Sequence, residues 1–278
     1  MPALSILFVG DADRSEFRQA RACLDRWGAV QGFADADLAA AALAADRLSP
    51  DVMVVAQAFP GQFSHQAIDR LRRLAPLARV LGLMGSWCEG EMRSGSPWPA
   101  TVRTYWHQWP ARCDRQFRRL AMGQSCSWAL PLTATEEERL MVDAAECLPE
   151  EGPHPCAHFA PSSGTLVAIR SHSHEMADWL SAACRSRGLV TIRQRDSAFA
   201  RVEGATAGVF DGTDLCDDEC DALRRFVVAV RPAPVIALLS FPRIEDHDRA
   251  LSAGASIVLS KPLLMADLLG EIEGRIVC

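Results

Sequence analysis

Lys261 and Asp211 are the two residues whose types and positions first suggest chemistry. Of the 29 lysine and arginine residues, Lys261 is the only lysine, and it directly follows the apolar run SIVLS. Asp211 likewise closes a short β-rich run, AGVFD. A compact ammonium group on a flexible stem can approach a carboxylate end-on, where the planar fork of an arginine is a poor substitute. If the fold brings the ends of these runs together, the two side chains form a candidate pair.

Two histidines, His172 and His174, provide a second candidate site in the stretch RSHSHE. Together with Asp211 they could bind Zn²⁺ or Fe²⁺. The alternative is that they are loop residues that face solvent. The ten cysteines add little to a metal site, because Cys216 and Cys220 form CxxxC rather than CxxC. We expect most cysteines to be small buried residues in a reducing compartment and predict no metal.

Length and composition limit the classes of protein to consider. The 278 residues suffice for two domains, and 49% of them are apolar. The net charge of −6 and the lack of a long basic run argue against nucleic-acid binding. No apolar run approaches the roughly 20 residues of a membrane span, and the first residues do not resemble a signal peptide. We therefore expect a soluble, cytoplasmic protein that does not bind membranes.

The second half of the chain alternates between strand and helix patterns, which predicts a parallel sheet with helices on both faces. Strands are predicted at 165–169, 189–193, 207–211, 234–240 and 256–260, and helices at 175–187, 221–230, 245–253 and 265–276.

The first half repeats this scheme. Strands are predicted at 4–9, 30–33, 51–55, 79–84 and 102–106, and helices at 14–27, 35–46, 63–74 and 112–122. The pattern breaks at 85–101, where Gly, Ser, Pro and Trp disfavour a helix. We predict an α/β protein of two doubly wound, five-stranded domains at 1–123 and 164–278. The connector, 124–163, contains one helix capped by Thr133 or Thr135.

The second half resembles the receiver domain of response regulators. AGVFD places Asp211 at the family's phospho-accepting aspartate, and SAGASIVLSKP places Lys261 at the family's lysine. The resemblance covers roughly 165–276 and implies that Asp211 and Lys261 lie at the carboxyl ends of neighbouring strands, in a crevice where such sheets bind ligands. Counting back from AGA, the family's switch hydroxyl falls on Leu239, so Ser240 could serve only if the loop is one residue shorter.

The resemblance also exposes what is missing. Receivers use two acidic residues after the first strand to hold Mg²⁺, and these positions here hold Arg170 and Ser171. Because a guanidinium repels a cation and phosphoryl transfer depends on the metal, phosphorylation lacks its usual support. Asp214, Asp217 or Asp218 would have to replace the lost ligands.

The first half departs further from the family. Ala56 stands at the aspartate position, and Trp109-Pro110 lies near the position of Lys-Pro. Asp11, and with it Asp13, is what remains of the acidic pair. We therefore expect a degenerate receiver that keeps the scaffold without the chemistry.

Four of the seven tryptophans lie in or just after the 85–101 segment, with Arg103 and Tyr105 nearby. This composition is typical of binding hot spots. The alternative is that the rings fold back over a sheet that lacks its fourth helix. The four partner-binding candidates are Trp87, Trp98, Trp106 and Trp109.

Three functions remain open from the sequence. The preferred one is a non-catalytic signalling or scaffold protein, without cofactor, that acts by protein–protein contact. The second is an atypical phospho-receiver. In it, Asp211 accepts phosphate with the help of Mg²⁺, Lys261 binds the attached phosphate, and the hydroxyl of Ser240 acts as the switch residue that contacts it. The third is a metalloenzyme that uses His172, His174 and Asp211. Expected partners are a histidine kinase or another receiver, and the sequence is also compatible with a homodimer.

Overall fold

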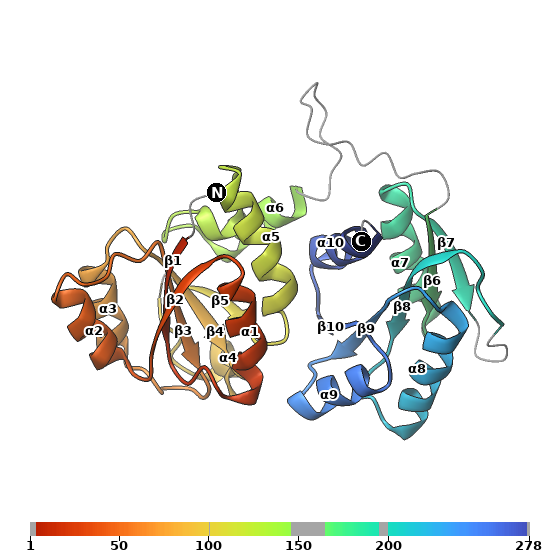
Figure 1. Cartoon of the computed structure of the whole chain (residues 1–278), viewed down its shortest axis with the longest axis horizontal. Coiled ribbons are helices and arrows are strands. Elements are labelled where there is room, and N and C mark those ends of the chain that lie inside the picture. Colours follow the sequence, from red (N-terminus) through yellow and green to blue (C-terminus); the bar gives the residue numbers. More distant parts are fainter. Residues whose placement is uncertain (1–3, 100, 146–164, 195–199, 277–278) are drawn as a thin grey trace. The chain divides into compact units, whose positions relative to one another are not determined.

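The computed structural model describes residues 4–99, 101–145, 165–194 and 200–276. These residues form two compact units, Met1–Asp143 (unit 1) and Ala144–Cys278 (unit 2). Each unit contains one five-stranded, all-parallel sheet flanked by helices, as Figure 1 shows. Both sheets have the flavodoxin-like strand order, in which the second strand lies at one edge and the first lies beside the third.

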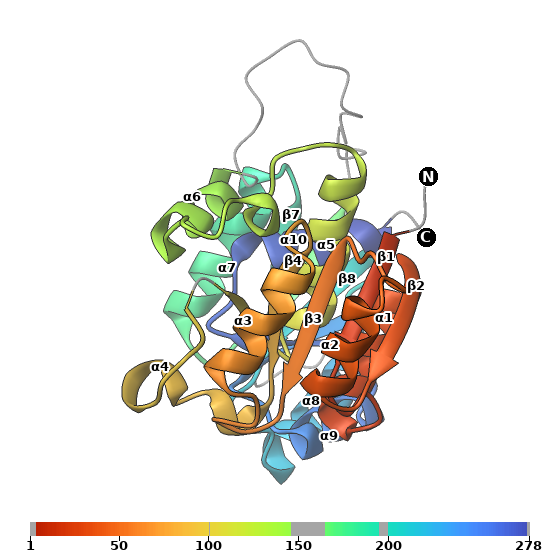
Figure 2. The same ribbon diagram turned by 90° about the vertical axis from the view of Figure 1, so that its left-hand side faces the viewer.

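Unit 1 has the sheet order β2-β1-β3-β4-β5. Helices α1 and α5 pack beside each other, and α2 packs beside α3; Figure 2 shows α2 and α3 in front of the strands. The strands are β1 (Leu4–Val9), β2 (Gly28–Phe33), β3 (Val52–Gln57), β4 (Arg79–Met84) and β5 (Val102–Tyr105). The helices are α1 (Ser15–Asp25), α2 (Ala36–Ala44), α3 (His65–Leu74), η1 (Ser86–Cys88), α4 (Glu91–Ser94), α5 (Trp109–Ala121), η2 (Ser127–Ala129) and α6 (Glu136–Ala145).

Unit 2 repeats the topology in the order β10-β9-β8-β6-β7. Helix α7 packs beside α10, and α8 beside α9. The strands are β6 (Leu166–Arg170), β7 (Val190–Gln194), β8 (Ala205–Asp211), β9 (Val235–Ser240) and β10 (Ile257–Lys261). The helices are α7 (His174–Ser186), α8 (Asp217–Val230), α9 (Ile244–Ser252) and α10 (Met265–Ile276).

Local sequence explains where several helices begin. The side chain of Asp35 accepts a hydrogen bond from Leu38 N at the start of α2, as predicted, and Ser173 accepts one from Met176 N at the start of α7. Thr135 and Glu138 form reciprocal bonds at the start of α6, which confirms Thr135 as the cap. The central strand β3 is buried along its whole length, as expected of a strand covered by helices on both faces.

Two segments differ from the sequence expectation. The 85–101 segment is not free of helix, because η1 and the one-turn helix α4 form within it. The helix predicted in the connector forms as α6, and its buried residues belong to unit 1: Asp143 bonds to Arg115 and Gln116 of α5. Within the described residues, no helix is both long and apolar enough to cross a bilayer.

Candidate functional site

Asp211 and Lys261 meet at the carboxyl edge of the unit 2 sheet. Lys261 Nζ lies 2.6 Å from Asp211 Oδ1 and also donates to Gly212 O at 2.6 Å. The expectation that their strands are neighbours was wrong, because β9 lies between β8 and β10. Lysine suits the position because its long stem carries the ammonium across the end of the intervening strand. The Asp211 residue is only 8% exposed, so the pair is largely shielded from water.

Ser171 occupies the other oxygen of the same carboxylate. Its hydroxyl donates to Asp211 Oδ2 at 2.5 Å, and its oxygen accepts from Ser173 N at 3.1 Å. Ser171 directly follows β6, which pairs with β8 and thereby places the hydroxyl beside Asp211. Both oxygens of Asp211 therefore have a protein hydrogen-bond donor.

Arg170, the other residue in place of the acidic pair, is buried at the end of β6. Its guanidinium carbon lies 5.9 Å from the centre of the Phe210 ring, within the range of a cation–π contact. Arg170 pairs in register with Phe210, the residue before Asp211, so its side chain shares a sheet face with Phe210 and supplies no carboxylate for a Mg²⁺ site.

Ser240 is the last residue of β9 and pairs in register with Lys261. Its amide donates to Thr213 O at 2.9 Å. Among the described residues, no hydrogen bond joins its hydroxyl to Asp211 or Lys261. Leu239, where the family spacing puts the switch hydroxyl, is fully buried. The described geometry thus places no hydroxyl from β9 on Asp211.

The metal candidates do not converge. In the part of the chain that the structure describes, the one group with three potential ligand atoms within 4.8 Å of one another is Asp214, Cys216 and Glu219. Among the described residues, His172, His174 and Asp211 form no such group. Glu219 itself accepts from Thr213 N and Leu215 N at 2.9–3.0 Å. Its carboxylate therefore organises the loop after β8.

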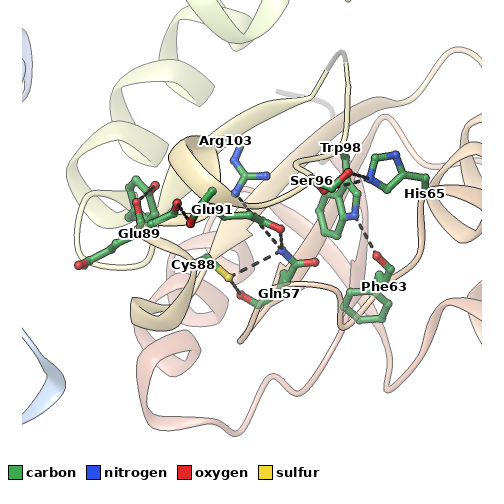
Figure 3. Close-up of polar contacts among 12 residues, drawn as sticks. Gln57, Phe63, His65, Cys88, Glu89, Glu91, Ser96, Trp98 and Arg103 are labelled. Atoms are coloured by element: carbon green, nitrogen blue, oxygen red, sulfur yellow. Dashed lines mark hydrogen bonds and ion pairs between the residues drawn. The ribbon is translucent and has the colours of Figure 1, made fainter.

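Unit 1 has a different polar cluster at the equivalent edge, drawn in Figure 3. Gln57 ends β3 as Asp211 ends β8, and its Nε2 lies 3.2 Å from both oxygens of Glu91. Arg103 of β5 forms an ion pair with Glu91, which is almost wholly buried. Cys88 accepts from Gln57 Nε2 at 3.7 Å, and burial raises the pKa of its thiol to about 11, so the thiol stays neutral.

The Asp11 and Asp13 remnant does not take part in this cluster. Both residues are exposed in the loop after β1, where Asp13 N donates to Asp11 Oδ1 at 3.0 Å. Gly10 precedes them with φ +128°, and a Cβ there would lie 2.6 Å from Ala56 O. Because this position has no room for a side chain, unit 1 cannot place a carboxylate ligand there.

The tryptophans divide unequally between core and surface. Trp98, Trp106 and Trp109 are buried, and Trp98 Nε1 donates to Phe63 O at 3.0 Å. Trp87 of η1 is 74% exposed. Arg103 is not a surface contact residue, because its side chain is only 11% exposed and pairs with Glu91 of α4. Trp109 and Pro110 begin α5, so this pair starts a helix.

Sequence reasoning missed Gln57, Glu91 and the use of Arg103. One signal was available for Gln57, because a polar residue ends an otherwise apolar strand. Nothing in the 85–101 segment marked Glu91, whose partners are 12 and 34 residues away.

No family model and no curated protein matches the chain. Solved structures with similar folds include a CheY-like response regulator from Mesorhizobium loti, with 15% identity, a TM-score of 0.33, and coverage of 40% of this chain and 98% of that one. A probable two-component response regulator/GGDEF domain protein shows 11% identity, a TM-score of 0.36 and 98% coverage of both chains. The C-terminus of E. coli RcsC, with its phosphoreceiver domain, shows 14% identity, a TM-score of 0.33, and 98% and 93% coverage.

Proposed function

We propose that this chain is a non-catalytic signalling protein whose two receiver-like units act through protein–protein contact. The observation that carries the proposal is the occupation of Asp211: Lys261 binds one carboxylate oxygen and Ser171 the other. A phospho-acceptor must offer a free oxygen to the incoming phosphorus, with a metal beside it to neutralise charge. In unit 2 Ser171, at a position where receivers carry a metal-binding acid, instead donates to Asp211, and together with Lys261 it holds the crevice in one state.

Unit 1 supports the same proposal. Gln57 at the end of β3 carries an amide, which forms no acyl phosphate, and a buried Glu91–Arg103 pair fills the space beside it. The surface through which this unit acts includes Trp87. A large exposed aromatic ring on a structured turn is a typical anchor for a partner.

Incubation of the full chain with acetyl phosphate and Mg²⁺, followed by intact mass measurement, tests the proposal. We expect no gain of a phosphoryl group. A gain that disappears in Asp211→Asn would overturn the proposal in favour of the phospho-receiver. The double variant Arg170→Asp/Ser171→Asp restores the acidic pair, and it serves as an internal comparison because it returns the missing carboxylates and frees one oxygen of Asp211.

A further inference from the structure

Helix α6 packs on unit 1 with its polar side inward. The buried residues of this helix are Arg139 and Asp143. Arg139 donates to Ser127 O at 2.5 Å, and Asp143 accepts from Arg115 Nη1 at 3.1 Å. A helix on the surface of a globular protein normally buries its apolar stripe and leaves its polar residues in water. In α6 this order is reversed, and its apolar side chains therefore lie on the outside.

The outer face of α6 is apolar. Leu140, Met141 and Ala144 are all exposed, and as residues i, i+1 and i+4 they lie on one side of the helix. The exposed fraction of Met141 is 66%. Single exposed apolar residues are common, but a group of them on one surface indicates a contact site. The large apolar residues exposed in the short range 122–141 are Met122, Leu132, Leu140 and Met141.

The charges beside this face differ between the two neighbouring helices. On α6, Glu136 is exposed one turn before Leu140. On α5, Arg118 and Met122 are exposed, and they follow Arg115 at i+3 and i+7 on the stripe that contacts α6. Neither Glu136 nor Arg118 forms an ion pair with another described residue. The outer face of α6 is thus acidic and apolar, whereas the end of α5 is basic and apolar.

We propose that this α5–α6 surface binds a second copy of the chain, with α6 of one copy against the end of α5 in the other. A two-fold axis makes such an interface complementary to itself, because every contact occurs twice. Leu140 and Met141 pack against the partner's Met122, and Glu136 faces the partner's Arg118. An apolar centre with charged residues at its edge is the usual composition of a protein interface.

The length of α6 limits the strength of this contact. The helix has ten residues and is therefore about 15 Å long. A patch built on it is smaller than the roughly 800 Å² per partner of a standard interface. We therefore expect a reversible dimer whose dissociation constant is roughly micromolar.

Sedimentation velocity of the full chain over a range of concentrations tests the inference. The weight-average sedimentation coefficient of the wild type should rise with concentration. Met141→Glu should raise the dissociation constant by about tenfold or more, because it places a charge in the apolar centre. Met92→Glu is the matched control: Met92 of α4 is 65% exposed and lies outside the α5–α6 surface, so this variant should associate as the wild type does.

Exchange of the two charges tests the orientation of the copies. Glu136→Arg and Arg118→Glu should each weaken the dimer about tenfold, because the symmetry repeats the repulsive contact. The double variant Glu136→Arg/Arg118→Glu should recover the dissociation constant of the wild type, and circular dichroism shows that each variant is folded. A wild-type chain that stays monomeric at every concentration would assign the α6 face to a different partner and overturn the inference. Equal association of Met141→Glu and Met92→Glu, or no recovery in the double variant, would also overturn it.

Discussion

At the scale of single residues, the Lys261–Asp211 pair combines two largely buried charges. Removing one partner leaves the other charge buried and unpaired, which typically costs about 3–5 kcal/mol. We therefore expect Lys261→Met to lower the free energy of unfolding of unit 2 by an amount of this order, as measured by urea denaturation. The double variant Lys261→Met/Asp211→Leu should recover most of the loss, because neither charge remains.

A matched control for this prediction is Asp214→Asn, which removes an exposed carboxylate from the same edge of the sheet. It should change stability little. If Lys261→Met is as stable as this control, the ammonium does not compensate the buried carboxylate.

Glu16 ties helix α1 to the turn that carries Trp87. Its oxygens accept from Ser86 N at 3.0 Å and Arg14 Nε at 2.9 Å. Burial alone would raise the pKa of Glu16, but the hydrogen bonds from Ser86 and Arg14 outweigh burial and hold its pKa below the usual 4.5. Because the folded pKa is the lower one, this stabilisation is present above pH 4.5 and is lost as the pH falls through the folded pKa.

We expect Glu16→Gln to be less stable than the wild type at pH 7 by about 1.5–3 kcal/mol, the usual contribution of hydrogen bonds to a charged group. The difference should shrink in acid, because the wild-type carboxyl becomes protonated. Denaturation midpoints of both proteins between pH 7 and pH 3 measure this. Glu137→Gln, at an exposed position of α6, is the control, and a difference independent of pH would contradict the assignment.

At the scale of elements, the 85–101 segment presents one tryptophan and buries another. Trp98→Ala removes a ring that packs against Phe63 and should cost about 3–5 kcal/mol. Trp87→Ala removes an exposed ring and should change stability by less than about 0.5 kcal/mol. Thermal denaturation of the two variants measures the contrast. A large loss in Trp87→Ala would show that this ring stabilises the fold and would remove it from the contact surface.

The elements themselves were largely predictable from sequence, since apolar runs alternated with helical patterns and β3, β8 and β9 are buried as such runs require. The short helix α4 was not predictable, because its four residues lie among glycines and serines that favour turns. It is held by the long-range contact of Glu91 with Arg103 and Gln57, which local pattern cannot reveal. The Asp211–Lys261 contact was predictable only through the family resemblance, because the two residues are 50 positions apart and no local pattern links them.

At the scale of the whole molecule, the structure places the first compact unit's end beyond α5. Trp128 of η2 packs 5.1 Å from Trp109 and 5.6 Å from Phe117, as measured between ring centres. Arg139 of α6 donates to Ser127 O at 2.5 Å, and Asp143 pairs with Arg115 at 3.1 Å. The segment after α5 therefore completes the hydrophobic core of unit 1.

It follows that a chain of residues 1–145 should unfold in one cooperative step, and that a chain of residues 1–123 should be less stable. Loss of the Trp128 ring alone should cost about 3–5 kcal/mol, and the Arg115–Asp143 pair is lost with it. Urea denaturation followed by circular dichroism measures both chains, with Trp128→Ala in the full chain as the control for the ring. Equal midpoints for the two truncated chains would mean that η2 and α6 contribute nothing to the core and that unit 1 is complete at the end of α5.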